Sequence, residues 1–120
     1  MTKVLIVEDD SWQLEHYRRV LSRRAYDVHT CAHALDAIDV IDELQPDAVV
    51  MDVRLPSVNA FGLLHELQSH ADLARIPVVL MTTQAELAHR NLSHYGVREV
   101  LDKSTMQLDD MHVALQRALA

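Results

Sequence analysis

The sequence of 120 residues contains one cysteine, two glycines and three prolines, and aromatic residues make up only 4% of it. A single cysteine cannot form an internal disulfide, so the fold must be stabilised by its core. Together with 49% hydrophobic and 24% charged residues, the low glycine and proline content is typical of a globular chain and not of a disordered or repeat chain. There is no run of about 18 apolar residues and no signal-peptide layout, so we expect a cytoplasmic protein without membrane contact.

Positive charge is also scarce in this chain. Eleven Lys and Arg stand against 18 Asp and Glu, which gives a formal net charge of −7 at pH 7. An acidic surface repels phosphate backbones, so we expect no direct nucleic-acid binding by this domain. No two of the eight histidines lie four residues apart on one predicted helix, because His29 and His33 straddle the end of a predicted strand, so a helical zinc site is not expected. With 49% hydrophobic residues, the length predicts one globular domain over residues 1–120.

Short apolar runs alternate with longer segments of helical periodicity. The predicted strands cover 3–7, 27–31, 47–51, 77–81 and 97–101, and the predicted helices cover 11–24, 33–44, 61–70, 85–94 and 105–119. Three runs are almost wholly apolar, as expected for strands covered on both faces. The helical stripes include Leu35 and Leu108. Successive βα units predict a single three-layer α/β domain, with a five-stranded parallel sheet and helices on both faces.

Polar residues follow four of the five predicted strands. They are Glu8, Asp9 and Asp10 after the first, Asp52 after the third, Thr82 and Thr83 after the fourth, and Lys103 after the fifth. The carboxyl ends of parallel strands share one edge of a sheet, where ligands bind. Carboxylates gathered there repel one another unless a cation lies among them, and oxygen ligands without Cys or His suit Mg²⁺. The pattern therefore predicts a magnesium site.

A carboxylate can act as a nucleophile and form an acyl phosphate. Asp52 directly follows a buried-looking apolar run, so we predict phosphoryl transfer to this side chain. Lys103 would supply a countercharge and Thr82 a hydrogen bond to the phosphoryl oxygens. Asp10 is better explained as the N-cap of the first helix, and Thr83 as a structural residue.

Four stretches, "VLIVEDD", "VVMDVRLP", "PVVLMTT" and "GVREVLDK", together resemble the receiver domain of two-component response regulators. The resemblance covers the whole chain and implies the flavodoxin-like strand order 2-1-3-4-5. It implies that Asp52 is the phosphoacceptor, that Thr82 is the switch hydroxyl and that Lys103 is the active-site lysine.

The resemblance also implies a cofactor and partners. Mg²⁺ would be bound directly by Asp9, Asp52 and the backbone carbonyl of Arg54, with Glu8 acting through water. The phosphoryl donor would be a phosphohistidine on a histidine kinase or phosphotransfer protein. The chain would catalyse its own phosphorylation and dephosphorylation, without turnover of an external substrate. A homodimer or target would bind the face formed by the fourth helix, the fifth strand and the fifth helix.

Three positions depart from the family pattern. Val100 stands where an aromatic residue is common, Ser104 where a proline usually follows the lysine, and Ala60 where a glycine is usual. Val100 and Ser104 support an alternative, a degenerate receiver that acts as a protein-binding module without phosphotransfer. A flavin-binding electron carrier is less compatible, because the loop after the first strand is acidic where a phosphate-binding loop needs Gly, Ser or Thr.

Overall fold

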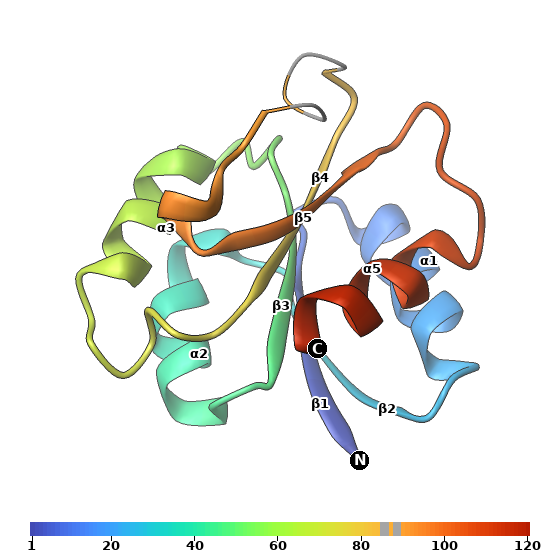
Figure 1. Cartoon of the computed structure of the whole chain (residues 1–120), viewed down its shortest axis with the longest axis horizontal. Coiled ribbons are helices and arrows are strands. Elements are labelled where there is room, and N and C mark those ends of the chain that lie inside the picture. The colour runs from blue at the N-terminus through green and yellow to red at the C-terminus, as the bar shows by residue number, and fades with distance from the viewer. Residues whose placement is uncertain (85–86, 88–89) are drawn as a thin grey trace.

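The structure is a computed structural model that describes residues 1–84, 87 and 90–120. Strands and helices alternate along the chain (Figure 1). The strands are β1 (Thr2–Val7), β2 (Tyr26–Cys31), β3 (Ala48–Asp52), β4 (Val78–Thr82) and β5 (Val97–Asp102). The helices are α1 (Ser11–Ser22), α2 (Ala37–Leu44), α3 (Ala60–Gln68) and α5 (Asp110–Leu119), with two short 3₁₀ turns, η1 (Ala34–Asp36) and η2 (Ser93–Tyr95).

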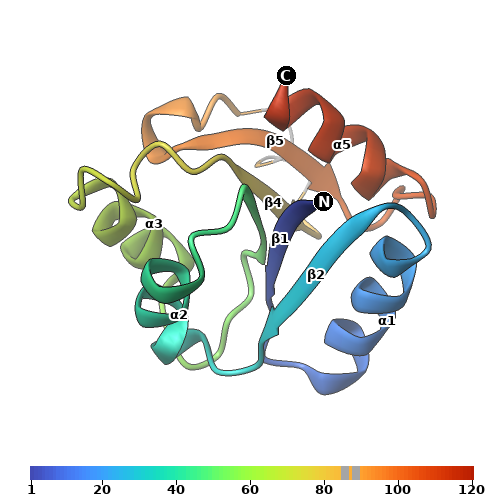
Figure 2. The same ribbon diagram turned by 90° about the horizontal axis from the view of Figure 1, so that it is seen from below.

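The five strands form one parallel sheet in the order β2-β1-β3-β4-β5, which confirms the predicted architecture and strand order. Helices α1 and α5 lie on one face of the sheet, and α2 and α3 lie on the other (Figure 2). Within the described ranges, none of the helices has the length and apolar character that a membrane-spanning segment needs.

The side chains of each central strand alternate between two core layers. On β1, Val4 and Ile6 belong to the layer under α1 and α5, and Leu5 and Val7 to the layer under α2 and α3. Every residue of β3 and β4 is buried, as expected for parallel strands covered on both faces. The last residue of β3 is Asp52, so the fold itself holds a carboxylate inside the protein.

The second and the last predicted helices begin later than the apolar pattern indicated. Regular α-helix starts at Ala37 and at Asp110. Leu35 and Leu108, which the predicted stripes placed in the core, are 73% and 61% exposed. Both residues precede the regular helix, so the 3.6-residue period that predicted their burial does not apply to them.

The predicted helix over residues 85–94 lies largely outside the described residues. Residues 90–92 are not helical, and η2 follows them, so the end of this prediction was wrong. Leu92 is nevertheless buried in the core layer under α2 and α3. Leu92 is therefore buried as its apolar character predicted, although it does not lie in a regular helix.

Gly96 follows η2 with a φ of 79°, which is strained for any residue with a Cβ. A Cβ would also lie 2.5 Å from Nε2 of Gln68, which donates to the carbonyl oxygens of Ala74 and Tyr95. We expect Gly96→Ala to lower the free energy of unfolding by about 1–3 kcal/mol in urea titrations. Gly62→Ala on α3, where an added Cβ would make an ordinary contact with Cβ of Asn59 at 3.7 Å, is the matched control and should not destabilise the protein. Equal losses in the two variants would contradict the argument.

Candidate active site

The carboxyl edge of the sheet gathers the chemically capable side chains predicted from the sequence. β3 lies at the centre of the sheet between β1 and β4, and its last residue is Asp52. Glu8 directly follows β1, Thr82 ends β4 and Lys103 directly follows β5. Glu8, Asp52 and Thr82 are the three buried polar or charged residues of the described chain. The fold thus concentrates its buried polarity at one edge.

Asp52, which is buried, and Lys103, which is partly buried, form an ion pair. Nζ of Lys103 lies 2.5 Å from Oδ2 of Asp52, and the two side chains are 15% and 4% exposed. Oδ1 of Asp52 accepts a hydrogen bond from the Arg54 N–H at 2.8 Å. Burial acts to lower the pKa of Lys103, but hydrogen bonds with Asp52 and Tyr17 outweigh it and raise this pKa. A cation therefore faces the carboxylate in a site that is largely shielded by the protein.

Two side chains of α1 position Lys103. Its ammonium donates to Oε1 of Gln13, and the Tyr17 hydroxyl donates to the same oxygen at 3.0 Å. The ammonium also lies 5.7 Å from the centroid of the Tyr17 ring. The sequence pattern placed Tyr17 in the apolar stripe of the first helix and did not single out Gln13. The i, i+4 spacing of these two residues was the available signal.

Glu8 is buried with one carboxylate oxygen unsatisfied. Its Oε1 accepts from the Asp10 N–H at 3.0 Å, and its Oε2 has no hydrogen-bond partner among the described residues. Burial raises the pKa of Glu8 from 4.5 to about 7; the Asp10 hydrogen bond opposes this rise, and nearby Asp52 adds to it. A buried, unsatisfied carboxylate oxygen next to a second carboxylate is suited to interact with a cation or its water shell.

Asp9 bridges two loops at the same edge. Its Oδ1 accepts from the Ala34 N–H at 2.9 Å, and its Oδ2 accepts from the Ser57 hydroxyl at 2.7 Å. In the part of the chain that the structure describes, no three His, Cys, Asp or Glu side chains are grouped closely enough to hold a metal. The oxygen-only donor set still fits Mg²⁺ chemically, although both oxygens of Asp9 accept hydrogen bonds in this structure. Ser57 carried no recognisable signal in the sequence.

Thr82 is held at the end of β4 by backbone contacts. Its carbonyl oxygen accepts from the Lys103 N–H at 2.8 Å, and its Oγ1 accepts from the Gln84 N–H at 2.9 Å. A hydroxyl that accepts one hydrogen bond still has its own proton to donate. Thr83, the next residue, is exposed. The buried hydroxyl of Thr82 is therefore the one placed to contact a group at this edge.

Two further residues have structural roles. Oδ1 of Asp10 accepts from the N–H groups of Trp12 and Gln13, which confirms that Asp10 is the N-cap of α1. Ala60, which replaces the usual glycine, is the first residue of α3 and follows the N-cap Asn59. A regular helical start accommodates its Cβ without a special backbone conformation.

The raised pKa of Glu8 predicts a pH-dependent stability of the metal-free protein. The folded state binds the Glu8 proton more tightly than the unfolded chain does, so the bound proton contributes to the free energy of unfolding. This contribution is fully present below pH 4.5, the pKa of the unfolded chain, and is lost as the pH rises through about 7, the pKa of the folded state. In urea titrations over this pH range, the free energy of unfolding of wild type should fall by on the order of 3 kcal/mol relative to that of Glu8→Gln. Glu66→Gln, at an exposed position of α3, is the control and should show no such relative change.

Comparison with known sequences gives one family model and several curated relatives. The family model described as response regulator receiver domain matches residues 4–116. The chain is 30% identical over 124 residues to the regulatory protein AtoC of Escherichia coli (strain K12) and 32% identical over 88 residues to the response regulator MprA of Mycobacterium sp. (strain KMS). These matches cover 99% and 73% of this chain, but only 25% and 37% of the two relatives.

Solved structures share the fold along nearly the whole chain. A response regulator receiver domain protein from Clostridium thermocellum superposes with a TM-score of 0.85 at 21% identity, covering 99% of this chain and 94% of that one. The receiver domain of a sensor histidine kinase from Pseudomonas aeruginosa PAO1 has a TM-score of 0.85 at 24% identity, with coverages of 98% and 97%. That second structure is described with a magnesium ion coordinated in its active site cleft.

Proposed function

The chain belongs to the response regulator receiver domain family of two-component signalling, and from this premise we propose that it accepts a phosphoryl group on Asp52. The observation that carries the proposal is the partly buried ion pair of Asp52 and Lys103, at 2.5 Å, at the carboxyl end of the central strand. A nucleophilic carboxylate needs a neighbouring positive charge that can stabilise the phosphoryl oxygens as they approach. In this ion pair, Asp52 supplies the nucleophilic carboxylate and Lys103 supplies the positive charge.

The phosphoryl donor that we propose is a phosphohistidine on a histidine kinase or phosphotransfer protein. A carboxylate oxygen of Asp52 attacks the phosphorus, an O–P bond forms, and the P–N bond to the donor imidazole breaks. The imidazole nitrogen keeps the electron pair of the broken bond, and Asp52 becomes an acyl phosphate. Lys103 then holds a phosphoryl oxygen as an ion pair, and the Thr82 hydroxyl donates its proton in a hydrogen bond to another.

The cofactor that we propose is Mg²⁺, held by Asp9, Asp52 and the backbone carbonyl of Arg54, with Glu8 acting through water. When bound, it would offset the negative charge of the carboxylates and of the incoming phosphoryl group. Glu8 supports this assignment, because its Oε2 is buried and unsatisfied among the described residues. Asp9 also supports this assignment. Its carboxylate is held by a hydrogen bond from the neutral Ser57 hydroxyl, so its negative charge can still act on a cation.

The output of the switch is a changed protein surface. The chain spans only 25% of the length of AtoC and 37% of the length of MprA. The activities of those whole proteins are therefore not assigned to this chain. We propose that residues 1–120 are one receiver domain and that a homodimer or target binds the face that includes β5 and α5. With a net charge of −7, direct nucleic-acid contact through this domain is unfavourable.

Intact-mass measurement tests the phosphotransfer directly. After incubation with Mg²⁺ and a small phosphodonor such as acetyl phosphate, we expect the mass of one added phosphoryl group, lost again on incubation without donor. Omission of Mg²⁺ should strongly reduce the addition. A protein that stays unmodified under these conditions would favour the alternative reading, a receiver that acts only as a binding module.

A further inference from the structure

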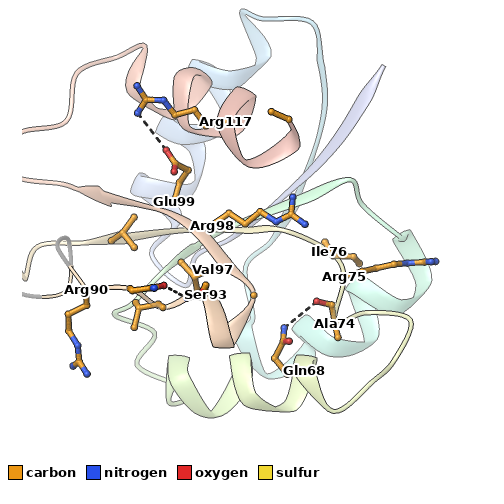
Figure 3. Close-up of a pocket in the computed structure, with 15 residues that line it drawn as sticks. Gln68, Ala74, Arg75, Ile76, Arg90, Ser93, Val97, Arg98, Glu99 and Arg117 are labelled. Carbon is orange, nitrogen blue, oxygen red and sulfur yellow. Dashed lines mark hydrogen bonds and ion pairs between the residues drawn. The ribbon is translucent and has the colours of Figure 1, made fainter.

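A polar groove lies at the amino end of β5, the end remote from Lys103 (Figure 3). It has a volume of about 790 Å³ and is formed by the segment before β4, the residues around η2, the first four residues of β5 and the end of α5. No residue of the candidate active site is among its lining residues in the described chain. Its function is therefore not explained by phosphotransfer chemistry.

The groove is basic although the protein is acidic. Four of the 11 Lys and Arg of the chain line it: Arg75, Arg90, Arg98 and Arg117. Within the described chain, Glu99 is the single acidic side chain in the lining. All four arginines are exposed. Gathered around one hollow of a molecule with a net charge of −7, they create a local positive potential that attracts anions.

The fold builds this groove through long-range contacts. Pairing of β4 with β5 passes from Val78 opposite Val97 to Val79 opposite Glu99, so Arg98 is the extra residue of a β-bulge. Nη1 of Arg98 donates to the Ala118 carbonyl at 2.8 Å, which ties β5 to the end of α5. The basic lining is thus held by backbone register as well as by side-chain contact.

Most of the guanidinium groups remain available for a ligand. Within the described part of the chain, the side chains of Arg75 and Arg90 have no hydrogen-bond or ion-pair partner, and they point outward at separate ends of the groove (Figure 3). Arg117 lies 3.7 Å from Oε1 of Glu99 with its side chain 70% exposed. Such an exposed, long contact holds the arginine only weakly.

We propose that this groove binds an acidic peptide segment of a partner protein. The guanidinium groups are spread along the groove, which suits several carboxylates spaced along an extended chain; a small single anion requires donors that converge on one point. No aromatic residue occurs in the lining among the described residues, so a nucleotide base finds no surface on which to stack. The inference rests on the proposed function in one respect, since it gives a chemistry to the partner that we place on the face with β5 and α5, and it does not depend on phosphotransfer to Asp52.

Fluorescence anisotropy with a labelled peptide of about eight glutamates tests the proposal. At low ionic strength we expect saturable binding to wild type, and the double variant Arg75→Ala/Arg90→Ala should raise Kd about tenfold. The matched control is Arg19→Ala/Arg23→Ala, which removes two exposed arginines outside the groove and changes the net charge equally. An equal loss in both double variants, or no binding to wild type, would overturn the proposal.

Two parallel measurements distinguish other occupants of the groove. If inorganic tripolyphosphate binds and the glutamate peptide does not, the groove is a phosphate site and the proposal is wrong. Sedimentation velocity of the chain alone should show no association that depends on Arg75 and Arg90. Association lost in their double variant would identify a second copy as the occupant and would also overturn the proposal. No phosphodonor is present in these experiments, so their failure leaves the phosphotransfer proposal standing.

Discussion

Asp52→Asn is expected to abolish covalent phosphorylation, the largest effect that any single substitution should have on this protein. The neutral amide cannot form the acyl phosphate that a carboxylate forms, although its shape is nearly the same. Intact-mass measurement after incubation with Mg²⁺ and acetyl phosphate should show one added phosphoryl group on wild type and none on the variant. Asp42→Asn, at an exposed position of α2, is the control and should be modified like wild type.

The fold of the Asp52→Asn variant should survive the change. Its amide oxygen can still accept from Lys103, and removal of a buried carboxylate relieves repulsion with Glu8. Thermal melts in the absence of Mg²⁺ should therefore show a cooperative transition like that of wild type. A phosphorylated Asp52→Asn protein would mean that another carboxylate is the acceptor and would contradict the assignment.

The second large effect is expected in Asp9→Ala, which should lose most of the stabilisation that Mg²⁺ gives to wild type. A ligand that binds only the folded state raises the unfolding free energy by mass action, by about 2.7 kcal/mol at 100 times its Kd. Millimolar Mg²⁺ should accordingly raise the Tm of wild type by several degrees. Without Asp9, one of the proposed direct ligands is missing and the shift should nearly vanish.

The response to Mg²⁺, and not the melting temperature itself, is the quantity to compare. Asp9→Ala also removes hydrogen bonds to Ala34 and Ser57, so the variant starts from a lower stability. Asp10→Ala is the matched control: it removes the α1 cap, at a cost of about 1 kcal/mol, and should keep the full Mg²⁺ shift. A full shift retained by Asp9→Ala would place the ion elsewhere.

The sequence by itself determined the sheet and the edge on which the candidate site lies. The central strands are buried on both faces, so they must be continuous apolar runs, and such runs are visible without a structure. A charged residue that ends such a run, as Asp52 does, is then conspicuous. The N-cap Asp10 was likewise predictable, because capping depends on a few neighbouring residues.

Only the tertiary structure decided which side chains meet at that edge. Gln13 and Tyr17 hold Lys103 across about 90 residues of sequence, and Ser57 binds Asp9 from another loop. The i, i+4 spacing of Gln13 and Tyr17 indicates that these two side chains meet on α1, but it does not identify Lys103 as their partner, because that contact depends on how separate elements pack.

The start of α5 and the basic groove were decided in the same way. The apolar stripe continued back to Leu108, but regular helix begins at Asp110, where the chain meets the core. The four arginines of the groove lie far apart in sequence, and in a chain of net negative charge none of them stands out. The parallel register, shifted by one bulge at Arg98, brings them around one hollow. Local patterns are readable in sequence because they repeat within a few residues, whereas this groove exists only once distant segments have packed.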